Sequence, residues 1–150
     1  MQTPRGETEG GGSRDTSRTD WRPAAAIAAA VLLASVVPVP GDASAGGGVV
    51  SLTDPFHLLG YAALAAALVC PVGAGLRERI GFRSAALLPR TAVVATLAAL
   101  ASTAFGLGVE VVQAPIPWRS FAVADAVVNA VGALIGAAIA VAWWGHRKRA

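Results

Sequence analysis

Eight side chains capable of binding or acid–base chemistry occur in three short groups along the chain. The groups lie near residues 54–61, 110–113 and 119–129, and their members are Asp54, His57, Tyr61, Glu110, Gln113, Arg119, Asp125 and Asn129. Spacings of three and four residues place the members of a group on one face of a helix. A carboxyl group beside a histidine is the environment of general acid–base catalysis, and the same groups also suit an ion or a lipid headgroup.

The elements that must position these side chains are long apolar runs. The chain of 150 residues is 55% hydrophobic and only 14% charged, with a mean hydropathy of +0.59. A soluble domain carries about 25% charged residues, and here the charges form short blocks between the apolar runs. The chain therefore has too few charged residues to cover the surface of a soluble domain. Insertion into a membrane removes this difficulty, because lipid then covers the apolar surface.

We therefore predict an all-α membrane protein, a bundle of about four transmembrane helices in one domain over residues 23–145. The spans are expected at about residues 24–39, 55–73, 91–112 and 121–144. Residues 1–22 are Gly-, Ser-, Thr- and charge-rich and are predicted to form a disordered cytoplasmic tail. Residues 146–150 are predicted to form a basic cytoplasmic tail.

The first apolar run has a second interpretation, a cleaved secretory signal peptide. Arg18 and Arg22 would supply its basic region, and the sequence Ala43-Ser44-Ala45 matches a small-residue cleavage site. Both interpretations leave the following loop outside the cytoplasm, so the topology of the later spans does not depend on the choice.

The basic residues predict the orientation of the spans. Eleven of the 12 lysines and arginines lie before the first span, between the second and third, or after the fourth, and only Arg119 lies in the other loops. The positive-inside rule then places both termini in the cytoplasm. The eight polar residues would all lie at the outer ends of the spans. Trp143 and Trp144 are expected at a membrane interface.

Small residues continue the polar faces into the bundle. Back from Glu110, the face of the third span carries small or weakly polar residues, Gly106, Thr103, Ala99 and Thr96. Beyond Asn129, the fourth span carries Gly132 and Gly136, a spacing that lets two helices approach closely. The polar ends are therefore expected to meet in one shielded outer pocket.

These residues resemble the signature of VanZ-like membrane proteins. The stretch from Asp54 through His57 to Tyr61 is similar to one motif of that family. Similarity continues through a set in the same order, Glu110, Gln113, Pro117, Arg119, Asp125, Asn129, Gly132 and Gly136. The chain departs from the family at Pro55, where a lysine is usual, and at Trp118, where a glycine commonly precedes the arginine. The resemblance implies a small membrane protein of the cell envelope without a defined reaction.

Simpler roles remain open for each member of the set. Asp54 suits a helix N-cap before Pro55, Tyr61 an interfacial anchor, and the carboxyl and amide groups hydrogen bonds between helices. Cys70 is the single cysteine, so neither an intrachain disulfide nor a cysteine-based zinc site is expected. No metal and no cofactor is predicted. Nucleic-acid binding is not expected either, because the basic residues form no continuous face.

Three functions follow from these alternatives. The first is a binding or modulating module for a lipid-linked or anionic cell-envelope component, with Arg119 as the main anion contact and membrane lipids as partners. The second is an intramembrane enzyme acting on a lipid headgroup, with Glu110 or Asp125 as general base and His57 as acid–base group. The third is a transporter, which four short spans could form only as a homo-oligomer.

Overall fold

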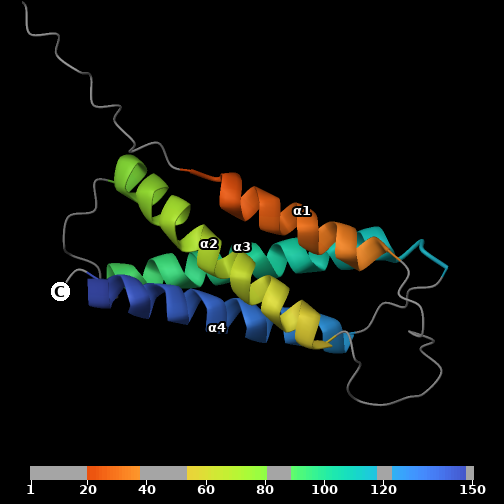
Figure 1. Ribbon diagram of the computed structural model, residues 1–150. Coiled ribbons are helices and arrows are strands. Elements are labelled where there is room, and N and C mark those ends of the chain that lie inside the picture. The colour runs from red at the N-terminus through yellow and green to blue at the C-terminus, as the bar shows by residue number, and fades with distance from the viewer. Residues whose placement is uncertain (1–19, 38–53, 81–88, 118–122, 148–150) are drawn as a thin grey trace, which may run out of the picture.

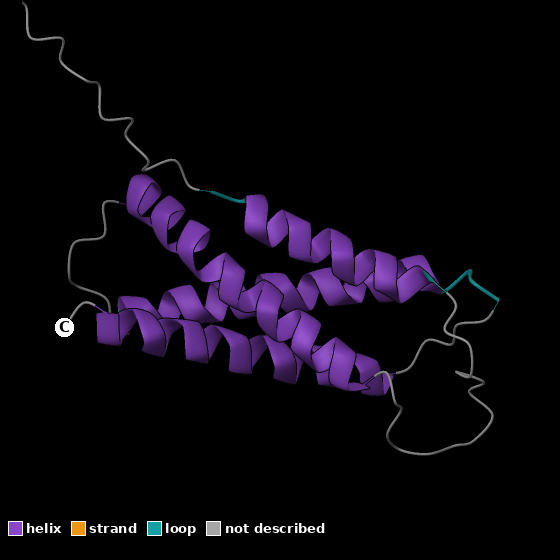
Figure 2. Cartoon of the chain, viewed as in Figure 1, coloured by secondary structure: helices purple, strands orange, loops and turns teal. Residues whose placement is uncertain are grey.

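The computed structural model describes residues 20–37, 54–80, 89–117 and 123–147, and within these ranges the chain is all-helical. Its helices are α1 (Arg22–Val36), α2 (Asp54–Ile80), α3 (Arg90–Gln113) and α4 (Val123–Arg147). Consecutive helices run in alternate directions (Figure 1). We name the end where α1 and α3 finish and α2 and α4 begin the cluster end, and the opposite end the basic end. The prediction of an all-α fold is confirmed (Figure 2).

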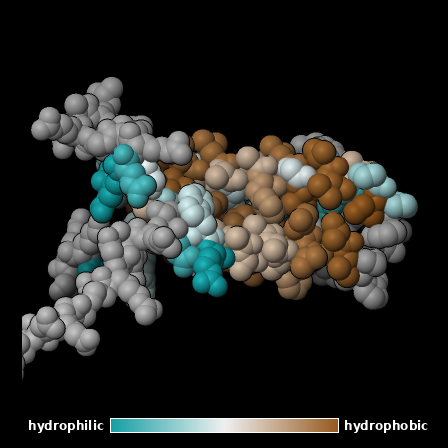
Figure 3. All heavy atoms as spheres, turned by 90° about the horizontal axis from the view of Figure 1, so that it is seen from above, coloured by the Kyte–Doolittle hydropathy of each residue, from teal (hydrophilic) through white to brown (hydrophobic). Residues whose placement is uncertain are grey.

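Three of the described helices are long and apolar enough to cross a membrane. They comprise residues Pro55–Glu78, Arg90–Gln113 and Ala124–Arg147. Large apolar side chains stay exposed along α3 and α4, including Leu100 at 60% and Ile139 at 63%. Figure 3 shows apolar residues covering the middle of one face, with hydrophilic residues toward its ends. These features indicate a membrane protein, because an exposed apolar surface of this kind is stable in lipid.

The first apolar segment forms a short helix that begins and ends earlier than the predicted span. Helix α1 has 15 residues, which corresponds to a rise of about 22 Å, whereas the apolar core of a bilayer is about 30 Å thick. Residues 38 and 39, which complete the predicted span, lie outside the described residues. The structure therefore shows three candidate spans and one shorter apolar helix, packed on α2 and α3.

The predicted end of α2 was wrong by more than a turn, and other predicted boundaries were wrong by smaller amounts. Helix α2 does not end at residue 73 but continues through Pro71 to Ile80. An interior proline removes one hydrogen bond, and neighbouring helices in a bundle make that loss tolerable. Arg22 belongs to α1 rather than to a tail, and His146 and Arg147 belong to α4. Residues 1–19, the rest of the predicted disordered tail, lie outside the described residues.

The centre of the bundle is built from small side chains. Its core comprises Ala65, Val69, Val94, Ala98, Ala99, Ala133 and Ala137 from α2, α3 and α4. Helix α4 packs closely on α2 at two glycines: a Cβ atom at Gly132 would overlap the backbone carbonyl of Leu58, and one at Gly136 that of Ala62. This close approach brings the first turns of α2 and α4 together at the cluster end.

Candidate functional site

Six of the eight predicted residues lie in described helix ends at the cluster end. His57 and Tyr61 lie in the opening turns of α2, Glu110 and Gln113 in the closing turn of α3, and Asp125 and Asn129 in the opening turns of α4. We name these six residues the polar cluster. The alternating helix directions visible in Figure 1 are what bring the three helix ends to one place.

Tyr61 is at the centre of the polar cluster. Only 1% of its surface is exposed, so it is not an interfacial anchor. The His57 ring lies edge-on to the Tyr61 ring, with 6.4 Å between the centroids, and Phe105 lies at the same distance. The carboxyl groups of Glu110 and Asp125 are both close enough to interact electrostatically with the Tyr61 hydroxyl. Tyr61 therefore connects residues from all three long helices.

Asn129 is buried beside Tyr61 and has an unusual environment. Its surface is 1% exposed, and among the described residues neither Oδ1 nor Nδ2 has a hydrogen-bond partner. A Cβ atom added at Gly106 would lie 3.1 Å from the Asn129 Nδ2 atom and 3.0 Å from Cε1 of Tyr61. The glycine thus allows the amide and the ring to pack against α3.

His57 is a second residue with a buried polar atom that has no partner among the described residues. Its Nδ1 atom is buried and has no hydrogen-bond partner among the described residues, although the side chain as a whole is half-buried. Leaving a buried donor or acceptor unsatisfied costs about 1 to 3 kcal/mol. Most such groups in native proteins are paired, so each exception calls for a specific explanation.

Two other buried polar side chains are satisfied and serve the framework. The Gln113 Nε2 atom donates to the backbone carbonyl of Ser35 at 2.7 Å, a carbonyl in the last turn of α1 that lacks a partner within its own helix. The Ser102 hydroxyl donates to the carbonyl of Tyr61 at 3.1 Å. These bonds attach α1 to α3 and α3 to α2. Ser102 and Gln113 thus have hydrogen-bond partners, whereas the buried amide of Asn129 has none among the described residues.

The remaining two predicted residues cannot be placed in the polar cluster. Asp54 is the first residue of α2, but its side chain is not described, and Arg119 lies in the segment 118–122 outside the described residues. Within the described part of the chain, no three His, Cys, Asp or Glu side chains are grouped as metal ligands. The chemistry on view is therefore that of carboxyl, amide, phenol and imidazole groups.

The face predicted for the third span was correct only in part. Gly106 and Ala99 are buried and Thr103 is half-buried, but Thr96 is exposed. The buried face instead runs through Ala98 and Ser102. Ser102 lies four residues before Gly106 and eight before Glu110, so a strict spacing of four would have identified it.

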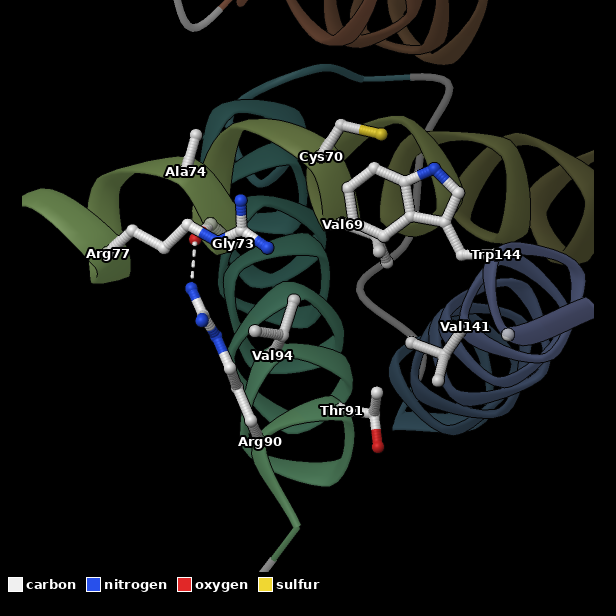
Figure 4. Close-up of a pocket in the computed structure, with 11 residues that line it drawn as sticks. Val69, Cys70, Gly73, Ala74, Arg77, Arg90, Thr91, Val94, Val141 and Trp144 are labelled. Carbon is white, nitrogen blue, oxygen red and sulfur yellow. Dashed lines mark hydrogen bonds between the residues drawn. The ribbon is translucent and has the colours of Figure 1, made fainter. Parts of the chain in front are cut away.

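A pocket at the basic end of the bundle was not predicted from the sequence. It has a volume of about 360 Å³ and lies between α2, α3 and α4, lined by apolar residues and by Arg77 and Arg90 (Figure 4). Arg77 reaches this pocket because α2 continues to Ile80, whereas a helix that ended at residue 73 would leave Arg77 in a loop.

Comparison of the chain with models of known protein families finds no match, and comparisons with curated proteins and with solved structures find none either.

Proposed function

We propose that the chain is a VanZ-like membrane protein whose polar cluster binds or modulates a lipid-linked or anionic component of the cell envelope. The observation that supports this proposal is the buried Asn129 amide, whose donor and acceptor have no partner among the described residues. A ligand that carries hydroxyl or amide groups would satisfy both atoms. The free-energy cost of burying the amide would then be recovered on binding.

The other members of the polar cluster favour a headgroup rich in hydroxyl groups, such as that of a lipid-linked sugar. Hydroxyl groups can donate to the carboxyl groups of Glu110 and Asp125 and accept from Asn129 Nδ2. His57 and Asp125 are half-buried and would form the entrance, with Asn129 one helical turn deeper along α4. Arg119 is the proposed contact for a phosphate that links the headgroup to its lipid.

The distribution of basic residues supports the location of this site. The basic end carries Arg77 and Arg90 together with Arg147, so the positive-inside rule places it in the cytoplasm. Both termini would then be cytoplasmic and the polar cluster would lie near the outer surface. In this arrangement α1 serves as the fourth span, shortened or supported by interfacial residues.

Mass spectrometry of lipids and metabolites that co-purify with the protein tests the proposal. We expect a lipid-linked species with the wild-type protein and its loss in Asn129→Leu, which keeps the side-chain volume but removes both polar atoms. Arg119→Ala should weaken retention of the same species. Thr96→Val is the matched control, because it makes a similar polar-to-apolar change at an exposed site on α3. Equal retention by Asn129→Leu and wild type would refute the proposal.

An intramembrane acid–base enzyme is the second candidate, favoured by the position of Glu110. Its side chain is 2% exposed and acts electrostatically on Tyr61, whose ring lies against His57. A buried carboxyl group near an imidazole is suited to proton transfer. If the bound species is converted, Glu110→Gln and His57→Ala should abolish turnover but not binding. Turnover retained in both variants would exclude this mechanism.

A further inference from the structure

The pocket at the basic end combines apolar walls with two cationic side chains. Val69 and Cys70 of α2, Val94 of α3, and Val141 and Trp144 of α4 form much of its wall. Arg77 of α2 and Arg90 of α3 extend along one side, and Figure 4 shows their guanidinium groups reaching toward the same region. Its volume of about 360 Å³ lies within the range of about 300 to 1,000 Å³ that is typical of ligand sites.

The two guanidinium groups are not neutralised by the described residues around them. Arg90 donates from Nη2 to the backbone carbonyl of Gly73 at 3.3 Å, and no carboxyl group lines the pocket. Two like charges directed at one region repel each other, and an anion between them removes the repulsion. Guanidinium groups also match the geometry of phosphate oxygens.

The apolar walls of the pocket and its position near the end of α4 distinguish a lipid from a soluble anion. Trp144 contributes to its wall. The preceding residue of α4, Trp143, is 61% exposed, and Arg147 lies 5.2 Å from the centroid of its ring. Tryptophan and arginine at a helix end are typical of the headgroup level of a bilayer. The apolar walls would contact the acyl chains of a lipid, whereas a free phosphate ion gains nothing from them.

We infer that this pocket binds an anionic phospholipid of the cytoplasmic leaflet, with its phosphate between Arg77 and Arg90 and its acyl portion against Val94, Val141 and Trp144. Basic pockets between transmembrane helices on the cytoplasmic side recognise such headgroups. The inference does not depend on the polar cluster, which lies at the other end of the bundle.

Cys70 provides a direct probe, because it is the single cysteine of the chain, is exposed, and lines the pocket. The protein is reconstituted in phosphatidylcholine vesicles with or without phosphatidylglycerol, and alkylation of Cys70 by N-ethylmaleimide is timed. We expect phosphatidylglycerol to slow alkylation several-fold in the wild type. The double variant Arg77→Gln, Arg90→Gln should lose this protection, although the vesicle surface charge is the same in both experiments.

Native mass spectrometry of lipid retention gives an independent measurement. Phosphatidylglycerol retention should fall about tenfold in the double variant, the loss of roughly one charge-assisted hydrogen bond, while phosphatidylcholine retention is unchanged. Arg22→Gln is the matched control, since it removes an exposed charge at the same end of the bundle but outside the pocket.

Three outcomes would overturn the inference. The first is undiminished protection and retention in the double variant. The second is an equal loss in Arg22→Gln, which would indicate attraction by net charge alone. The third is protection of Cys70 by inorganic phosphate in phosphatidylcholine vesicles equal to that by phosphatidylglycerol, which would indicate a soluble anion as the ligand.

Discussion

Gly106 is in contact with two side chains of the polar cluster, so a substitution there tests whether these side chains need the space that a glycine leaves. A Cβ atom there would lie 3.0 Å from Tyr61 Cε1 and 3.1 Å from Asn129 Nδ2, whereas one at Gly108 would meet nothing within 4 Å. We predict that Gly106→Ala lowers the free energy of unfolding by about 1 to 3 kcal/mol, because it displaces a buried ring and amide.

Thermal unfolding in detergent measures the effect of Gly106→Ala, with Gly108→Ala as the control on the same helix. The control variant should unfold at or above the wild-type temperature, since alanine favours helix over glycine. Equal behaviour of the two variants would show that the Tyr61 ring and the Asn129 amide are free to move apart.

A ligand-binding role and a structural role for Asn129 predict opposite changes in stability. If its amide is kept for a ligand, Asn129→Leu removes two unsatisfied buried atoms and leaves the ligand-free protein equally or more stable. Ser102→Ala, by contrast, breaks the bond to the Tyr61 carbonyl and should destabilise the protein by about 0.5 to 1.5 kcal/mol. Thermal unfolding of delipidated protein tests both variants. A marked loss of stability in Asn129→Leu would identify the amide as structural.

At the scale of the helices, the contact between α2 and α4 depends on two glycines. The atoms that a Cβ at Gly132 or Gly136 would overlap belong to the backbone of α2, which cannot rotate away as a side chain can. We predict that Gly132→Ala and Gly136→Ala each destabilise the bundle by about 3 kcal/mol or more, the upper range for overpacking.

The same displacement should spread from the packing contact to the polar cluster. Gly145→Ala on the same helix is the control, since a Cβ there meets nothing within 4 Å. Thermal unfolding and ligand retention should both fall in the Gly132 and Gly136 variants and stay at the wild-type level in the control. Wild-type stability in both variants would mean that α2 and α4 are less closely packed than the structure shows.

Helix type and the bounds of α3 were predictable from the sequence, while the end of α2 and the hydrogen bonds between helices were not. Apolar runs and the positions of Pro115 and Pro117 were sufficient to place α3 within one residue at each end. The end of α2 was missed because Pro71 and the charges at 77–79 have the composition of a loop, although packing in the bundle keeps the helix intact. The bond from Gln113 to the Ser35 carbonyl could not be predicted, because any sequence offers a backbone carbonyl.

For the whole molecule, the grouping of the polar residues at one end of the bundle was predictable. Which of their polar atoms have hydrogen-bond partners was not. Spacing and alternating helix direction are properties of the sequence, and they explain why Glu110 and Asn129 both come to lie near Tyr61. Whether a buried amide is satisfied depends on neighbours within about 3 Å, which spacing does not determine. The pocket beside Arg77 and Arg90 was not predicted, because α2 was expected to end at residue 73 and Arg77 was therefore expected in a loop.

The orientation of the molecule in its membrane decides which leaflet holds the polar cluster and which holds the pocket at the basic end. Single cysteines can measure this orientation. In a Cys70→Ser background, Ala114→Cys places a thiol at the cluster end and His146→Cys places one at the basic end, both at exposed positions. From the positive-inside rule, a membrane-impermeant maleimide should label the cysteine at 114 in intact cells and the one at 146 only after permeabilisation. Labelling of 146 alone in intact cells would invert the topology. The polar cluster would then face the cytoplasm, where a lipid-linked envelope component would have to be bound before its export.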